Sequence, residues 1–194
     1  MDHNLIFDEH VDMLCGKLAS LNFLLKRISP FLTKETKMLF YNSYVQSILI
    51  YCLCTWGLCN KSTLDQVFKM QKRICRTITG DFESPSSHVM GSLGVLNLHD
   101  QVVLNVACLV YKCLNNLAPQ PLFSLLNPTT SLNIYAIRNN SINVHIPFSR
   151  TETRKRAISF AGAKIWNSIP TDVRRSHSLT LFKMNMKNML LHKS

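Results

Sequence analysis

The sequence predicts a mainly α protein, in which a helical bundle is followed by a small basic α+β tail with a short strand or hairpin. Apolar residues recur every three or four positions in the first part of the chain, which is typical of helices that bury one face. Of the 194 residues, 46% are hydrophobic, enough to build a core. Near residue 127 a polar, proline-containing stretch coincides with a change in charge. We therefore expect two domains, residues 1–128 and 129–194.

Two helices are predicted first. Residues 9–28 carry apolar side chains at helical spacing, and Ser29 followed by Pro30 ends the pattern. A second helix is expected from residue 34 to about residue 51, with Thr33 as its N-cap and Glu35 near the positive end of its dipole. The inward positions of the first helix are Val11, Leu14, Leu18, Leu21 and Leu25.

A third helix is predicted to begin at a capping box made by Ser62 and Asp65, and to end near Gly80. Its inward stripe comprises Leu64, Val67, Phe68, Gln71, Ile74, Cys75 and Ile78. On its outer side, cations recur at helical spacing with no acidic neighbour between residues 66 and 79. These cations are Lys69, Lys72, Arg73 and Arg76. This face is either an ordinary solvated surface or a site for nucleic-acid phosphates.

The remaining elements of the first domain are shorter. Gly91 and Gly94 indicate a short helix or turn, residues 98–116 a buried helix, and Pro119 starts another short helix that reaches residue 126. In the tail, residues 140–147 alternate polar and apolar side chains and predict a strand, with residues 150–156 as a basic loop or a second strand edge. Residues 158–169 and 179–191 predict two helices, the first ended by Pro170 and the second capped by Ser178.

The charge of the chain favours a polyanionic partner. The net charge is +11, and it is unevenly spread: residues 1–128 hold 11 basic and 9 acidic residues, while residues 129–194 hold 11 basic and 2 acidic residues. The sharpest basic cluster is Arg150, Arg154, Lys155 and Arg156, which Lys164, Arg174 and Arg175 can join if the loop packs over the next helix. The alternatives are a nuclear-localisation-like or merely solvated patch. Trp166, Phe160 and Phe182 are expected in the core, with base stacking as the alternative for Trp166.

Other kinds of site are not indicated. Cys52, Cys54 and Cys59 lack the paired spacing of a zinc site, so structural cysteines are expected and no metal or cofactor. His88, His99 and His145 occur without a nearby acid and nucleophile arranged for catalysis, so ordinary surface or core histidines are expected. The uncharged residues 38–60 are interrupted by polar side chains, so a buried helix and turn is preferred to a membrane span. Unpaired cysteines and the lack of a secretory signal indicate a cytoplasmic or nuclear protein.

An ordered series of motifs resembles one family. Residues 64–76 follow the pattern Leu-x-x-x-x-Lys-x-Gln-Lys-Arg-x-x-Arg, preceded by a tyrosine-bearing helix with Trp56-Gly57. Downstream, residues 111–114 with Pro119, the stretch 144–147, Trp166-Asn-Ser-Ile-Pro170 and Phe182-Lys183 continue the series. From about His10 to Leu191 the chain resembles the thumb and tail that follow the polymerase core in LINE-type, jockey-like non-long-terminal-repeat retrotransposon reverse transcriptases.

This resemblance implies a thumb-like bundle that helps to hold a template–primer duplex and a tail that binds nucleic acid during target-primed reverse transcription. The parent protein would be an RNA-directed DNA polymerase. The chain itself lacks any Asp-Asp pair, and such a pair is needed to hold the catalytic magnesium ions, so we expect no polymerase activity from it. The expected partners are RNA, DNA or an RNA–DNA duplex, and an upstream polymerase core. The alternatives are a protein-interaction module that packs against this core through residues 38–59, and an inert relic.

Overall fold

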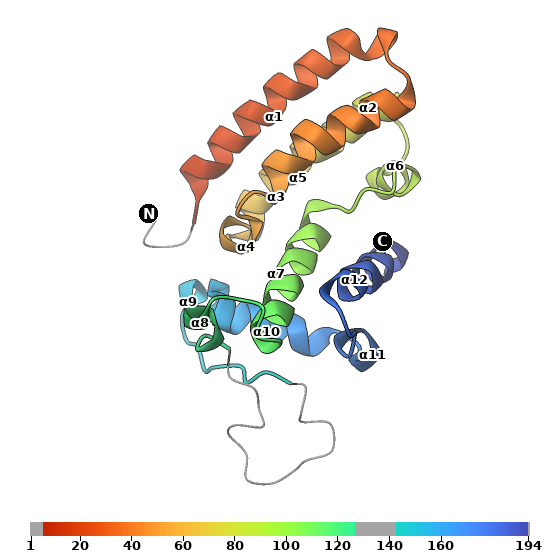
Figure 1. The fold of residues 1–194 in the computed structure, drawn as a ribbon. Helices are drawn as coiled ribbons and strands as arrows, with labels where there is room; N and C mark the ends of the chain where they lie inside the picture. The colour runs from red at the N-terminus through yellow and green to blue at the C-terminus, as the bar shows by residue number, and fades with distance from the viewer. Residues whose placement is uncertain (1–5, 127–142, 194) are drawn as a thin grey trace, which may run out of the picture. The chain divides into compact units, whose positions relative to one another are not determined.

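The computed structural model describes residues 6–126 and 143–193 (Figure 1). Most of these residues are helical, so the mainly α prediction is confirmed. The chain forms two compact units, the first made of Met1–Gln101 with Leu190–Ser194 and the second of Val102–Met189. The division falls inside helix α7 (Leu98–Leu114), whereas the predicted boundary between residues 128 and 129 lies outside the described residues.

The first unit begins with α1 (Asp8–Ile28), which confirms the first predicted helix. Its predicted inward side chains are buried except for Leu21, which is half-buried, and α1 packs along α5 (Lys61–Thr79), as Figure 1 shows. Pro30 lies in a short 3-10 turn, η1 (Ser29–Phe31), which ends the helix because proline cannot donate the next backbone hydrogen bond. Between this turn and the start of α7, the unit also contains α4 (Leu53–Trp56) and α6 (Ser86–Ser92).

The second predicted helix forms, but it is not regular. It consists of α2 (Lys34–Phe40), the π-helical turn η2 (Tyr41–Val45) and α3 (Gln46–Ile50). Thr33 caps it as predicted, since its Oγ1 accepts a hydrogen bond from the Thr36 N–H at 3.4 Å. At the π turn, Ser47 Oγ donates to the Ser43 carbonyl at 2.7 Å, a side-chain bond that competes with the regular backbone pattern.

Helix α5 forms where the third helix was predicted, but its start differs. It begins at Lys61 after Asn60, so Ser62 lies inside the helix and the predicted capping box is wrong. Asp65 instead lies beside His99 of α7, with its Oδ1 2.9 Å from the imidazole Nε2. The C-terminus is as predicted: Gly80 has φ +75°, a conformation that favours glycine, and its N–H bonds to the Arg76 carbonyl.

Polar contacts hold α5 to the rest of the first unit. Gln71 is fully buried, and its Nε2 donates to Tyr41 Oη and to the Leu96 carbonyl, both at 3.0 Å. Thr77 Oγ1 donates to Asn22 Oδ1 on α1 at 2.9 Å. The helix therefore has a fixed rotation about its axis, and this rotation determines which side chains face the solvent.

The second unit contains the rest of α7 and the helices of the tail. The helices predicted over residues 158–169 and 179–191 are confirmed as α10 and α12, and Ser178 Oγ accepts from the Leu181 N–H at 3.2 Å. A short turn of helix, α11, was not predicted. The elements are α8 (Gln120–Phe123), α9 (Glu152–Arg156), α10 (Ile158–Ser168), α11 (Thr171–Arg174) and α12 (Leu179–Lys193).

Residues 152–156 form a helix, so the predicted basic loop or strand edge is wrong. Thr151 Oγ1 accepts from the Arg154 N–H at 3.3 Å and caps α9. Glu152 lies in the first turn and the basic residues in the last, which is the charge order that the helix dipole favours. The Thr151 cap and this charge order stabilise one helical turn. The alternating pattern of the preceding residues had favoured a loop or strand edge instead.

The predicted strand is not confirmed. Residues 140–142 lie outside the described residues, and residues 143–147 contain an isolated β-bridge at Val144 but no strand. The Asn167 carboxamide also holds the backbone here, because its Oδ1 accepts from the Val144 N–H at 3.0 Å and its Nδ2 donates to the Val144 carbonyl at 2.8 Å. Val144 is buried, but Ile146 is 40% exposed, so the predicted common face of these side chains does not form.

Three aromatic rings form the centre of the second unit. Phe182 stacks on Tyr111 with ring centroids 4.7 Å apart, and Trp166 lies 5.8 Å from Phe182. All three side chains are buried, and Tyr111 Oη donates to the Ser176 carbonyl at 2.8 Å. The prediction that Trp166 and Phe182 belong to the core is confirmed, whereas Phe160 is half-buried.

Candidate nucleic-acid interface

The basic side of α5 is a consequence of helical spacing. The predicted inward positions of α5 are buried except for Phe68, which is half-buried, so the intervening cations are turned outward. Lys69 and Arg73 are exposed, whereas Lys72 and Arg76 are half-buried. The structure therefore places all four predicted cations on one helix with different access to solvent.

Two of these cations lie against neighbouring side chains of the same helix. The Lys72 ammonium is 4.1 Å from the centroid of the Phe68 ring, and Arg73 Nη1 is 3.6 Å from the Met70 sulfur. A cation over an aromatic ring gains about 0.5–1 kcal/mol at an exposed site and keeps its charge. Both side chains are thus partly ordered and still available to an anion.

Arg76 differs from the other three cations. Its Nη2 donates to the Ser84 carbonyl at 3.4 Å, and its Nε is buried without a hydrogen-bond partner. The loop that it holds is also closed by Asp81, whose Oδ1 accepts from the N–H groups of Glu83 and Ser84 at 3.1 and 2.9 Å. Arg76 therefore contributes to the loop after α5 as well as to the basic face.

Beside α5 there is an open groove of about 750 Å³ in the first unit. Three lysines line it against one carboxylate, so its character is cationic. Two of these lysines were predicted, and Lys61 was not. Lys61 precedes Lys72 by about three turns of helix, so both lie on one side of α5. This spacing could have identified Lys61 as a further member of the basic face. The lining residues are Lys61, Ser62, Asp65, Phe68, Lys69, Lys72 and His99.

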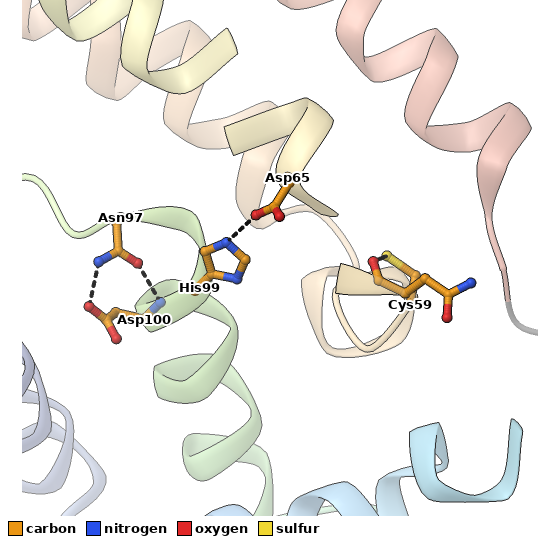
Figure 2. Close-up of polar contacts among 6 residues, drawn as sticks. Cys59, Asp65, Asn97, His99 and Asp100 are labelled. Atoms are coloured by element: carbon orange, nitrogen blue, oxygen red, sulfur yellow. Dashed lines mark hydrogen bonds and ion pairs between the residues drawn. The ribbon is translucent and has the colours of Figure 1, made fainter. Parts of the chain in front are cut away.

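A histidine from α7 borders the groove and is held in place by α5. His99 Nε2 lies 2.9 Å from Asp65 Oδ1 (Figure 2). The imidazole also meets the Phe68 ring edge-on, with centroids 5.2 Å apart and an interplanar angle of 79°. Asp65 and His99 are 34 positions apart in the sequence, and only the packing of α7 near α5 brings them together.

The start of α7 explains why His99 is well placed. Asn97 Oδ1 accepts from the Asp100 N–H at 2.8 Å, and Asn97 Nδ2 contacts Asp100 Oδ2 at 2.6 Å (Figure 2). The first bond satisfies one backbone N–H at the helix start, and together the two bonds order the first turn, to which His99 belongs. The position of the imidazole therefore depends on the cap and on Asp65 together.

The tail cations belong to the second unit. Arg150, Arg154 and Lys164 are exposed, while Lys155 and Arg156 are half-buried. Helices α9 and α10 are in contact, and Lys164 is on α10. The sequence suggested Arg174 as an additional member of this cluster. Its Nη1 donates to Asn143 Oδ1 at 2.7 Å, so this side chain takes part in a contact within the protein.

Lys155 is partly neutralised inside α9. Its Nζ lies 2.5 Å from Glu152 Oε1, and this hydrogen bond and charge hold the pKa of the Glu152 carboxyl below its ordinary value. Both side chains are substantially exposed, so the pair is a surface ion pair of small energetic consequence. Arg150 and Arg154 are therefore the more accessible cations of the predicted cluster.

The cysteines do not form a metal centre in the described part of the chain. No group of three or more His, Cys, Asp or Glu side chains that could hold a metal ion occurs in residues 6–126 and 143–193. Burial raises the pKa of the Cys75 thiol to about 12, which makes it unreactive. Within the same residues, the helices are too short or too polar to span a membrane.

A functional proposal for this chain rests on its sequence and on the geometry of its basic surfaces. The chain matches no protein-family model, no curated protein and no solved structure.

Proposed function

We propose that this chain is a non-catalytic nucleic-acid-binding region, equivalent to the thumb and tail that follow the polymerase core of a LINE-type retrotransposon reverse transcriptase. The observation that carries the proposal is the groove beside α5, where Lys61, Lys69 and Lys72 surround a single carboxylate. Lysine ammonium groups bind phosphate groups electrostatically, and several lysines along one helix can bind successive phosphates of a nucleic-acid strand.

The charge of the tail supports the same proposal. Residues 129–194 carry a net charge of +9, and Arg150, Arg154 and Lys164 are exposed to solvent. Each phosphate that a cation neutralises releases a counterion, so binding through such residues depends strongly on salt. The accessory role in polymerisation follows from the resemblance, and phosphate binding is supported by the accessible cations.

The proposal predicts steep salt dependence. We expect the full chain to bind a labelled RNA–DNA primer–template with an affinity that falls as the salt concentration rises. In the Lys61→Ala, Lys69→Ala, Lys72→Ala variant, the slope of log K against log salt should be smaller in magnitude by about 2–3. The measurement is fluorescence anisotropy from about 50 to 200 mM salt, the range over which phosphate contacts change affinity most visibly. A tail variant with Arg150, Arg154, Lys155 and Arg156 changed to Ala gives the contribution of the second unit.

The matched control removes cations that line no groove. Lys17 and Lys26 are exposed on α1, and the Lys17→Ala, Lys26→Ala variant loses two positive charges, one fewer than the groove variant. Slopes that fall only in proportion to the charges removed, three in the groove variant, four in the tail variant and two in the control, would mean that binding follows net charge alone. Absence of binding by the unmodified chain at low salt would refute the proposal.

Exposed apolar side chains favour a second candidate, a protein-interaction module that packs against a polymerase core. In the segment from α2 to the turn after α3, Leu39 is 66%, Tyr44 56% and Tyr51 71% exposed. Exposed apolar clusters often mark interaction sites. If this candidate is right, the fraction of the purified chain that self-associates rises with its concentration. The double substitution Leu39→Glu, Tyr51→Glu then gives a monomer in sedimentation experiments.

A further inference from the structure

The groove beside α5 combines lysines with an aromatic ring whose orientation is fixed. His99 is restrained at two points, by the 2.9 Å contact of Nε2 with Asp65 (Figure 2) and by edge-on packing against Phe68. Its side chain is nevertheless 34% exposed and lines the groove. A planar ring held in one orientation at the edge of a cationic groove is suited to stack with another planar group.

Phe68 is less suited to this role. The Lys72 ammonium lies 4.1 Å above its ring, and Phe68 is half-buried. Phe68 therefore supports His99, and the imidazole is the aromatic surface offered to a ligand. Asp65 and Phe68 are positioning residues in this arrangement.

The nearby charges indicate what accompanies the planar group. Lys61 and Lys69 are both exposed, and neither forms an ion pair with a residue in the described ranges. They lie on α5, in the same helix as Asp65 and Phe68, and line the same groove as His99. The groove is open and has a volume of about 750 Å³, which gives a planar organic group room to lie against the ring.

A nucleotide has both features, a planar base and a phosphate. In a duplex the bases are stacked and paired inside the helix, so only an unpaired base can stack on a protein ring. We infer that the groove binds single-stranded nucleic acid, with an unpaired base on His99 and the flanking phosphates at Lys61 and Lys69. This inference rests on the proposed nucleic-acid binding and specifies the form of nucleic acid that the first unit takes.

The test uses the full chain and a DNA oligonucleotide of about ten residues that carries 2-aminopurine, a base whose fluorescence falls on stacking. The site size of single-strand grooves is about 4–16 nucleotides, so this length fills one site. We expect quenching on binding, and an affinity about ten-fold higher for the single strand than for the same sequence in a blunt duplex, within the range that one stacked base contributes.

Substitutions separate stacking from charge. His99→Ala should weaken single-strand binding about ten-fold and remove the quenching, while His99→Phe, which keeps a ring, should retain most of both. His88 is exposed on α6 and lines neither this groove nor the α5 face, so His88→Ala is the matched control and should have no effect. Lys61→Ala with Lys69→Ala should reduce the salt slope by about 1.4, the value for two phosphates of a single strand.

The outcomes distinguish the two proposals. Equal binding of single strand and duplex without quenching, or an unchanged affinity of His99→Ala, would overturn the inference and leave nucleic-acid binding in place. A complete lack of binding to either form would overturn both. Circular dichroism of each variant establishes that it is folded, and His99→Phe keeps the inference testable if His99→Ala is not.

Discussion

Replacing Trp166 with alanine is expected to lower the free energy of unfolding of the second unit by about 3–5 kcal/mol, the usual cost of removing a buried tryptophan side chain. The side chain is 2% exposed and packs on Phe182 and Tyr111. Its removal leaves a cavity between α7, α10 and α12, the three helices that carry these rings. Neighbouring rings cannot fill such a space without leaving their own positions, because protein cores are close-packed.

Urea denaturation followed by far-UV circular dichroism measures this loss. Trp166→Phe is the matched variant, since it keeps an aromatic side chain and should lose distinctly less stability. A midpoint in Trp166→Ala equal to that of the unmodified chain would show that the ring does not belong to the core. It would also make base stacking by Trp166 the better explanation for a tryptophan at this position.

Replacing Leu18 with alanine is expected to lower the free energy of unfolding of the first unit by about 2–5 kcal/mol, the range for buried leucines. Leu18 is fully buried on α1, which packs along α5. Alanine is at least as good a helix former as leucine, so the loss reports packing and not helix formation. The groove depends on this packing, because α5 carries most of its lining residues.

The two tryptophans allow the units to be followed separately. Trp56 belongs to the first unit and Trp166 to the second, so in a Trp166→Phe background the fluorescence of Trp56 reports the first unit. Leu24 lies on the same helix as Leu18 but is 46% exposed, and Leu24→Ala should change the free energy of unfolding by about 0.5 kcal/mol or less. Equal midpoints for the two variants would contradict the packing of α1 on α5.

Much of the helical structure was predictable because it depends on local features. The ends of α1, α5 and α12 follow from a proline, a glycine and a capping serine, each of which acts on the residues next to it. The buried side of α5 followed from the spacing of its apolar residues. The four cations of α5 were predicted by the same periodicity.

Other features were missed because competing local signals or distant partners decided them. The alternation of residues 140–147 predicted a strand, but Asn167 supplies the hydrogen bonds of Val144 in the described part of this stretch. The loop or strand edge predicted at residues 150–156 is a helix, since Thr151 caps it and its charges agree with the helix dipole. The π turn at Tyr41 gave no clear signal in the apolar spacing of its helix.

By itself, the sequence determined that the protein is mainly helical, which faces of α1 and α5 are buried, and that α5 carries a row of cations, because these properties depend on residues within a few turns of one another. Only the tertiary structure decided that Asp65 holds His99 beside Lys61, Lys69 and Lys72. The groove joins residues from two helices that are far apart in the chain, and their meeting depends on how apolar faces pack, which no local pattern encodes.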